Sequence, residues 1–261
     1  YQGQYKLTFM DFASLGSGSK GNATLVRHGE TLLMIDCGFS LRETTRRMAR
    51  LGLSPEQLDA VLVTHEHSDH CAGVSKLSAK HQIPVYLTHG TKASGRCDGS
   101  YELLCFDCDE NFSIAEIDVR TIAVPHDAAE PCQFRLSAGG RCLGVLTDLG
   151  CITPHVVSSY QGCHSLLLEF NHDLDMLMAG AYPPQLKSRV SGDWGHLNNG
   201  QAADFLRQLE CTGELKNLVV AHISEKNNSR DRAEQALAAV LVSTEQVTWA
   251  QQQEGFDWLG V

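Results

Sequence analysis

Short apolar runs that end in polar, titratable residues recur along this sequence. In the clearest case, the uniformly apolar run Ala60–Val63 is followed directly by the segment THEHSDH, residues 64–70. A short, β-branched apolar run is typical of a strand buried on both faces. The five titratable groups that follow it are costly to bury unless something binds them, and a metal ion is the simplest compensation. The pattern therefore predicts a metal site at this strand end.

The same alternation predicts the elements of the first half. Strands are expected at Phe12–Leu15, Ala23–Arg27, Thr31–Ile35 and Pro84–Leu87, and helices at Leu41–Leu51 and Ala72–Lys80, with a helical turn at Ser54-Pro55. The glycine-rich segment 16–22 lies between strands of a hairpin pattern, so it is not a P-loop. Its N–H groups either face an anion or only close a tight turn. Residues 90–111 give no clear pattern.

In the second half, strands outnumber helices and helices separate the later strands. The predicted strands are Val119–Val124, Cys132–Leu136, Leu143–Leu146, Leu166–Leu168 and Leu218–Ala221. The predicted helices are Pro154–Tyr160, Pro183–Lys187, Gln201–Leu209 and Arg230–Val242. Two sheets packed face to face with helices outside, a four-layer αββα sandwich of the α/β class, accommodate this order, whereas one parallel sheet does not.

Composition fits a globular chain. It has 261 residues, 43% of them apolar and 20% charged, and no apolar stretch approaches 18 residues, so no transmembrane helix is expected. Tyr1–Phe9 resembles no signal segment, and we interpret residues 1–9 as a vector-derived scar before Met10. Ten cysteines without a secretory segment predict reduced thiols and a cytoplasmic protein. The CxxC at Cys105 and Cys108 is read as incidental, with a structural metal or redox role as the alternative.

The predicted strand ends supply further metal ligands. His65 and His67 can converge on one ion, while Asp69 and His70, one turn further on, point to a second. Strands of one sheet deliver their ends to a common edge, and three more residues follow predicted strands: His126, Asp148 and His222. We choose Asp148 as the carboxylate that bridges the ions. Two ions ~3.5–4 Å apart share a bridging hydroxide and lower its pKa toward neutrality.

The order HxHxDH, His126, Asp148, His222 resembles the metallo-β-lactamase superfamily of αββα hydrolases, over nearly the whole chain from Phe12. The resemblance implies one ion bound by His65, His67 and His126, a second bound by Asp69, His70 and His222, and Asp148 between them. These nitrogen and oxygen ligands suit zinc or manganese, with iron as a further option.

Four more segments narrow the resemblance. Residues 16–22 (GSGSKGN), 168–173 (LEFNHD), 195–198 (GHLN) and 222–224 (HIS) together resemble YycJ/WalJ-type bacterial proteins, relatives of the tRNase Z branch. That family implies 5′-to-3′ DNA exonuclease activity. Asp148 and His222 are too close in sequence for a β-CASP insertion, so residues 10–261 are expected to form a single domain. The long arm of tRNase Z is missing too, which disfavours precursor-tRNA processing.

The chemistry expected of such a site is phosphodiester hydrolysis. The net charge of −10 disfavours a broad basic surface, but two dications with two carboxylate ligands leave about +2 locally, which attracts a phosphate. The bridging hydroxide is the expected nucleophile. Asp69 is placed among the catalytic residues, and the resemblance implies that His196, paired with Glu169, protonates the leaving group. The alternatives are a solvated His196 and a Glu169 bonded only to backbone. Asp36, after a buried strand, is expected to fix the loop.

Substrate contacts are expected from the glycine-rich loop and from residues beside the catalytic pair. These are Ser17, Ser19, Lys20, Asn22, Lys187, Arg189, Asn199 and Lys226. The expected partner is nucleic acid, DNA rather than RNA, and no membrane; the oligomeric state is not indicated. Two alternatives stay open. One is a hydrolase of a small cyclic phosphodiester, thioester, lactone or lactam, and the other is a non-catalytic metal-binding regulator that has lost ligands, although none is lost here.

Overall fold

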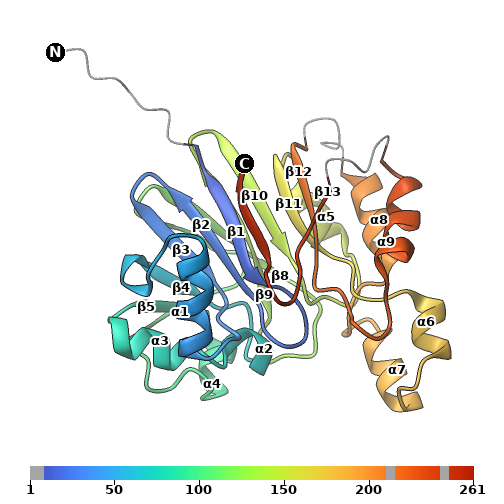
Figure 1. Ribbon diagram of the computed structural model, residues 1–261, viewed down its shortest axis with the longest axis horizontal. Coiled ribbons are helices and arrows are strands. Elements are labelled where there is room, and N and C mark those ends of the chain that lie inside the picture. The colour runs from blue at the N-terminus through green and yellow to red at the C-terminus, as the bar shows by residue number, and fades with distance from the viewer. Residues whose placement is uncertain (1–8, 210–214, 242–246) are drawn as a thin grey trace.

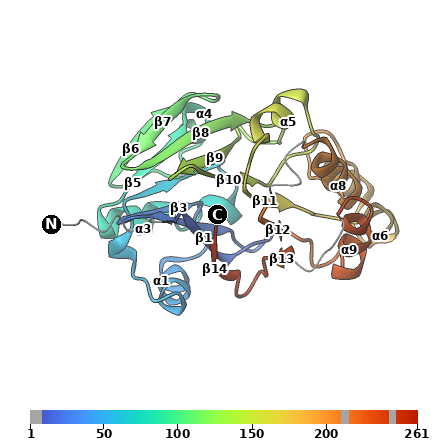
Figure 2. The same ribbon diagram turned by 90° about the horizontal axis from the view of Figure 1, so that it is seen from above.

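The computed structural model describes residues 9–209, 215–241 and 247–261. Two mixed sheets pack face to face, and helices cover the outer face of each (Figures 1 and 2). The predicted four-layer α/β sandwich is therefore confirmed. Of the predicted scar at residues 1–9, only Phe9 is described, so that interpretation stays a prediction.

The first sheet has seven strands in the order β14-β1-β2-β3-β4-β5-β6. Its strands are β1 Asp11–Gly16, β2 Ala23–His28, β3 Thr31–Ile35, β4 Ala60–Leu62, β5 Pro84–Thr88, β6 Glu102–Phe106 and β14 Phe256–Gly260. From β14 to β3 neighbouring strands are antiparallel, and from β3 to β6 they are parallel. The intervening helices are α1 Leu41–Arg50, the short η1 Pro55–Gln57, α2 Ser68–Cys71, α3 Val74–His81 and α4 His89–Ala93.

The second sheet also has seven strands, in the order β13-β12-β11-β10-β9-β8-β7. They are β7 Asn111–Ile114, β8 Ile117–Ala123, β9 Cys132–Ala138, β10 Arg141–Leu146, β11 Ser165–Glu169, β12 Asn217–Ala221 and β13 Val247–Trp249. The strands from β10 to β13 are parallel. Because parallel strands need crossovers, helices join or flank them: α5 Pro154–Tyr160, α6 Leu174–Ala179, α7 Pro184–Val190, α8 Asn199–Gln208 and α9 Arg230–Ala238.

Three apolar clusters match the four layers. The central cluster lies between the sheets, and one further cluster lies between each sheet and its helices. Strand β4 contributes to two of them, because Leu62 belongs to the central cluster and Val61 to the cluster beneath α1 and α3. The prediction that this strand is buried on both faces is confirmed, and its polar continuation therefore emerges at the edge of a fully covered sheet.

Several elements differ from the prediction. The unreadable region 90–111 contains β6, while α6, β13 and β14 were also missed. Both β6 and β14 are edge strands with mixed burial. In β14, Asp257 interrupts the apolar residues, so this strand lacks the apolar run that marks a central strand. The helix predicted over Ala72–Lys80 begins only at Val74, after Gly73, where an added Cβ would lie 1.9 Å from the Phe39 carbonyl oxygen. The last predicted helix ends at Ala238, and Val242 lies outside the described residues.

Within the described residues, no helix combines the length and apolar character that crossing a membrane requires. The nine cysteines in these ranges are free thiols, and Cys211 lies outside them. Cys105 packs against the outer cluster of the first sheet, whereas Cys108 packs against the central cluster. The CxxC pair is not among the metal-binding groups of the described chain, which favours the interpretation as incidental thiols.

Candidate metal centre

The loop after β4 is held by backbone contacts with the first sheet. The amide of Asn22 donates to the Asp69 carbonyl oxygen at 2.7 Å, and the amide of Cys37 donates to the His70 carbonyl oxygen at 2.7 Å. Gly38 makes this approach possible, because an added Cβ there would lie 1.8 Å from the Asp69 carbonyl oxygen. The loop is thereby fixed where the two sheets meet.

Asp36 orients the loop through its buried carboxylate. Its Oδ1 accepts from the Thr64 amide at 2.8 Å, and its Oδ2 accepts from the Thr64 hydroxyl at 2.8 Å. The same Oδ2 lies 2.7 Å from Nδ1 of His70. Because Nδ1 of His70 is occupied in this way, its Nε2 is left for the site, an arrangement common behind metal-binding histidines. Asp36 thus has the loop-fixing position expected of it.

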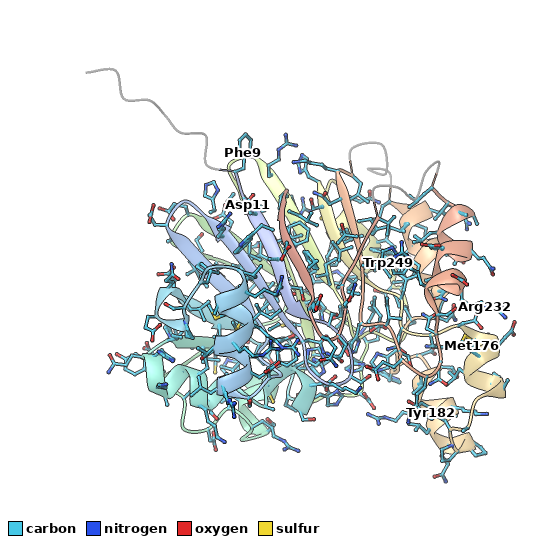
Figure 3. The ribbon with its side chains drawn as sticks, in the orientation of Figure 1. Phe9, Asp11, Met176, Tyr182, Arg232 and Trp249 are labelled. Atoms are coloured by element: carbon cyan, nitrogen blue, oxygen red, sulfur yellow. The ribbon has the colours of Figure 1, made fainter. Side chains whose placement is uncertain are left out.

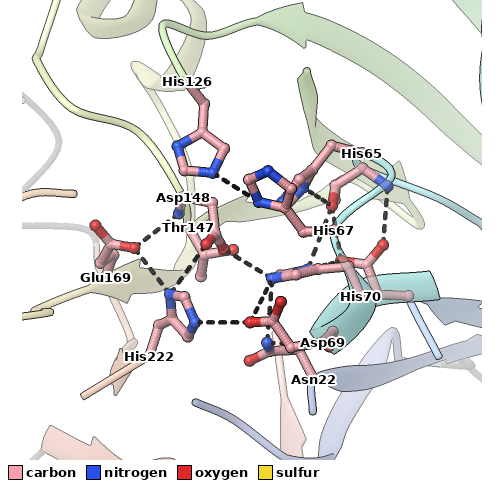
Figure 4. Close-up of polar contacts among 12 residues, drawn as sticks. Asn22, His65, His67, Asp69, His70, His126, Thr147, Asp148, Glu169 and His222 are labelled. Carbon is pink, nitrogen blue, oxygen red and sulfur yellow. Dashed lines mark hydrogen bonds and ion pairs between the residues drawn. The ribbon is translucent and has the colours of Figure 1, made fainter. Parts of the chain in front are cut away.

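Residues from three strands of the second sheet meet this loop (Figure 4). His126 follows β8, Asp148 follows β10 and His222 follows β12. The potential ligand atoms of each of three groups lie within 4.8 Å of one another: His65, His67 and His126; Asp69, His70 and His222; and His65, His70 and Asp148. The first two groups are the two sets that the resemblance assigned to separate ions, and Asp148 lies 3.2 Å from His70 and 3.3 Å from His222.

The donor set fits divalent cations. Nδ1 of His65 contacts the Thr64 hydroxyl at 2.9 Å, and Nδ1 of His222 contacts Glu169 at 3.0 Å. The other ring nitrogen of each, Nε2, is buried and has no hydrogen-bond partner among the described residues. A buried polar atom without a partner is costly, and a cation beside each of these nitrogens would satisfy it.

The charges of the site depend both on the loop 64–70 and on the residues at the strand ends of the second sheet. Burial holds the pKa of His65 well below its ordinary value, which leaves a neutral imidazole. Burial also acts to lower the pKa of His222, but the carboxylates of Asp148, Asp69 and Glu169 raise it to about 10. Similarly, Asp148 and Asp36 raise the pKa of His70 despite its burial. Cations compete with these protons, because histidine binds metals only in its neutral form.

Glu169 is the last residue of β11, and its carboxylate is shared by several residues on the second-sheet side of the site. Its Oε1 accepts from the Leu197 amide at 2.7 Å, and its Oε2 accepts from the Asp148 amide at 2.8 Å. Oε2 also lies 3.0 Å from Nδ1 of His222 and 3.1 Å from Nδ1 of His196. Burial raises the pKa of Glu169, but His196 and His222 outweigh it and lower the pKa to about 2. Both alternatives for this carboxylate, backbone anchor and histidine partner, are therefore realised together.

His196 stands on the wall of the site. Its side chain is 23% exposed, and its ring centroid lies 5.2 Å from that of His126 and 5.3 Å from that of His222. Burial opposes its protonation, but Glu169 and then Asp148 raise the pKa of His196 above its ordinary value. With Nδ1 held by Glu169, the ring presents Nε2 as the remaining proton carrier.

A cavity of about 550 Å³ opens over these side chains, hereafter the metal cavity. Its walls include His67, Asp69, Asp148, His222 and His196. Of the predicted substrate-binding residues, Ser19 and Arg189 also line it. The cavity therefore brings together four of the potential ligands, His196 and two of the expected substrate contacts.

Two residues of the glycine-rich loop, Ser17 and Asn22, are buried beside potential ligands. Ser17 donates its hydroxyl hydrogen to Asn22 at 3.2 Å and accepts from the His222 amide at 2.9 Å. The side-chain nitrogen of Asn22, Nδ2, donates to the Gly18 carbonyl oxygen at 3.1 Å and lies 3.1 Å from Nε2 of His70. Both side chains are buried and connect the loop to potential ligands. The structure therefore shows contacts that position these ligands, and the expected contact of Ser17 and Asn22 with substrate stays a prediction.

The remaining predicted contacts are spread over the rim and the interior. Lys20 forms an ion pair with Glu225 at 2.6 Å, Arg189 pairs with Asp127, and Lys187 donates to the Met178 carbonyl oxygen. Lys226 is exposed. Asn199 is not brought to the metal cavity: it is buried in the first turn of α8, where its side-chain amide exchanges hydrogen bonds with Asn228.

Arg96 was missed by the reasoning from sequence. It follows α4 in the region that gave no clear pattern, yet it is exposed and lines the metal cavity. Unlike Arg189, it forms no salt bridge with any residue in the described ranges. No local signal marked it, because only the packing of α4 beside β5 brings this segment to the metal cavity.

Comparison with known proteins identifies the family. Residues 31–223 match the beta-lactamase superfamily domain. The chain is 31% identical over 242 residues to exodeoxyribonuclease WalJ of Streptococcus pneumoniae, covering 90% of this chain and 89% of that protein. It is 33% identical over 236 residues to exodeoxyribonuclease YycJ of Bacillus anthracis, covering 89% of each.

Among solved structures, the metallo-beta-lactamase fold protein YhfI of Bacillus subtilis is similar with a TM-score of 0.76 at 15% identity. The match covers 97% of this chain and all of that one, and at this identity it is a likeness of fold alone. The sequence matches carry the assignment further than the fold does. The chain belongs to the metallo-β-lactamase superfamily and, within it, to the family of WalJ and YycJ.

Proposed function

We propose that this protein is a metal-dependent 5′-to-3′ exonuclease that hydrolyses the phosphodiester bonds of DNA. The observation that carries the proposal is the position of His196 on the wall of the metal cavity, held from behind by the buried Glu169 and lying beside a full set of potential metal-binding side chains. Both relatives are named exodeoxyribonucleases, which supports DNA as the substrate.

The seven proposed ligands divide as the resemblance implies. His65, His67 and His126 would hold one cation, and Asp69, His70 and His222 the other, with Asp148 between them. Zinc and manganese both suit these donors, and iron is a further option. Bound cations supply Lewis-acid chemistry, activating water and neutralising charge that develops on the phosphate.

The protein's own groups complete the reaction. Asp69 lines the metal cavity, and its carboxylate would orient the attacking water. His196 would donate a proton from Nε2 to the departing 3′ oxygen, while Glu169 holds Nδ1 and stabilises the charged ring. Glu169 raises the pKa of His196 despite its burial, which favours the protonated ring that a proton donor needs.

The local charge favours an anionic substrate. Two dications with the carboxylates of Asp69 and Asp148 leave a formal charge of about +2, in a protein whose net charge is −10. Arg96 adds an unpaired cation to the same wall. An acyl hydrolase acting on a thioester or lactam has no need of the His196–Glu169 pair. None of the nine described cysteines forms a disulfide, as is usual in a reducing compartment such as the cytoplasm.

The test compares wild-type protein with Asp69→Ala and His196→Ala on 5′-phosphorylated DNA labelled at one end, with added manganese or zinc. We expect shortening from the 5′ end by the wild type and loss of that activity in both variants. His155→Ala is the matched control, because His155, on α5, is exposed and is paired there with Asp109 from the segment between β6 and β7.

Parallel assays on RNA, a cyclic dinucleotide, nitrocefin and a thioester distinguish the alternatives. Turnover of a thioester or lactam without cleavage of DNA would contradict the proposal. A His196→Ala variant as active as wild type would remove the proton donor but leave the nuclease assignment standing.

A further inference from the structure

A second, smaller groove adjoins the metal cavity. It has a volume of about 200 Å³ and is lined in part by Ser19, Lys20, Tyr182, Ser224, Lys226 and Gln252; we call it the side groove. Ser19 lines both spaces, so the side groove begins at the edge of the metal cavity. A substrate that occupies the metal centre can therefore extend into it over Ser19.

One wall of the side groove is aromatic. Tyr182 lies between α6 and α7 at the end of the molecule that these helices form, and its side chain is half-buried (Figure 3). The Lys226 ammonium lies 5.7 Å from the centre of the Tyr182 ring. Proteins that bind single-stranded nucleic acids combine an aromatic ring with nearby positive charge. The ring stacks on the face of a base, and the positive charge attracts the phosphate of a linkage.

Another part of the wall carries Lys20 on a loop that hydrogen bonds hold in place. The Lys20 amide donates to Gln252 Oε1 at 2.8 Å, and Gln252 Nε2 donates to the Gly21 carbonyl oxygen at 2.9 Å, so the glycine-rich loop is fixed. The Lys20 ammonium pairs with Glu225, and the side chains of the pair are 62% and 53% exposed. So exposed a pair contributes little stability, and a phosphate can replace the Glu225 carboxylate at low cost.

We propose that the side groove binds the nucleotide next to the scissile linkage, with its base stacked on Tyr182 and its phosphate between Lys20 and Lys226. This inference rests on the proposed nuclease function. The volume is smaller than the roughly 300–1,000 Å³ typical of pockets for drug-sized ligands, so the side groove has room for one unpaired base. A nucleotide at the end of a duplex must therefore leave its base pair before it can enter the side groove.

The first test measures binding separately from cleavage. Fluorescence anisotropy with manganese present follows a 5′-phosphorylated single strand whose linkages are protected as phosphorothioates. Tyr182→Ala should bind about five- to tenfold more weakly, at the lower end of what loss of one stacking contact costs, whereas Tyr182→Phe should bind like wild type. Tyr101→Ala is the control, because Tyr101 is 56% exposed and is not among the residues lining either space.

An abasic site moved along the strand locates the contact. Wild type should lose the same factor when one nucleotide near the 5′ end lacks its base, and Tyr182→Ala should lose nothing more at that position. Losses that add at every position, or an unchanged affinity of Tyr182→Ala, would overturn the proposal. The same scan on an RNA strand shows whether the sugar matters.

Charge variants test the phosphate contact in both directions. Glu225→Gln removes the competing carboxylate from Lys20 and should tighten binding about two- to fivefold, whereas Lys226→Gln should weaken it and reduce the salt dependence by about one charge. Weaker binding by Glu225→Gln would contradict the model. Cleavage of unprotected DNA by wild type, with no effect of these variants, overturns the side groove alone. Binding without any cleavage overturns the nuclease function alone.

Discussion

The two halves of the metal centre are built in different ways. The first half comes from residues 64–70, a single loop after one strand. The second half comes from the ends of β8, β10 and β12, which bring His126, Asp148 and His222 together from distant parts of the sequence. The first half is therefore fixed by a local segment and its neighbours in one sheet, whereas the second requires the correct register of several strands.

Each half also has one buried carboxylate behind its ligands. Asp36 holds His70, and Glu169 holds His222, in both cases through Nδ1. Glu169 additionally holds His196 and the backbone of Asp148. From this difference we propose that Asp36 supports metal binding alone, whereas Glu169 supports both metal binding and proton transfer.

The largest effect is expected where the two halves meet. Asp148→Asn removes the carboxylate that lies between the two ligand sets, and loss of one metal contact worth several kcal/mol should lower kcat at least about a thousandfold. Metal content measured by mass spectrometry should fall with it. Asp109→Asn, which changes an exposed carboxylate, is the control. Full activity of Asp148→Asn would show that the halves do not share this ligand.

The two supporting carboxylates should then separate under excess metal. Asp36→Asn is expected to weaken metal binding about 10- to 100-fold, with kcat restored once the metal concentration is raised. Glu169→Gln should show a similar loss of metal affinity together with a lower kcat that added metal does not restore, because His196 loses its anionic partner. Titrations of metal against activity measure both. If excess metal rescues the two variants equally, the proposed division between Asp36 and Glu169 is wrong.

The smallest effect concerns substrate alone. Arg96→Gln should raise KM for DNA about two- to fivefold and reduce the salt dependence of binding by about one charge, with kcat unchanged, because one exposed phosphate contact is lost. Lys92→Gln in α4 is the matched control, since Lys92 is exposed and is not among the residues lining the metal cavity. Equal behaviour of the two variants would place Arg96 outside the substrate path.

The layered arrangement of the fold and the grouping of the potential ligands in residues 64–70 could both be predicted from the amino-acid sequence. The run Ala60–Val63 is apolar on both faces, which requires cover on both sides of its sheet, and the spacing within HxHxDH groups its ligands without help from the rest of the chain. His126, Asp148 and His222 were also recognisable, because each follows an apolar strand and strand ends share an edge.

The orientation of the other polar residues depends on contacts between distant segments, so it could not be predicted from the sequence. Ser17 and Asn22 turn inward to the ligands, Asn199 is buried against Asn228, and Arg96 reaches the metal cavity from a segment without a pattern. Edge strand β14 is likewise defined by pairing with β1 at the other end of the chain. The physical reason is the same in each case: local spacing sets which groups lie close along the chain, but the partner that orients a polar side chain comes from a distant segment.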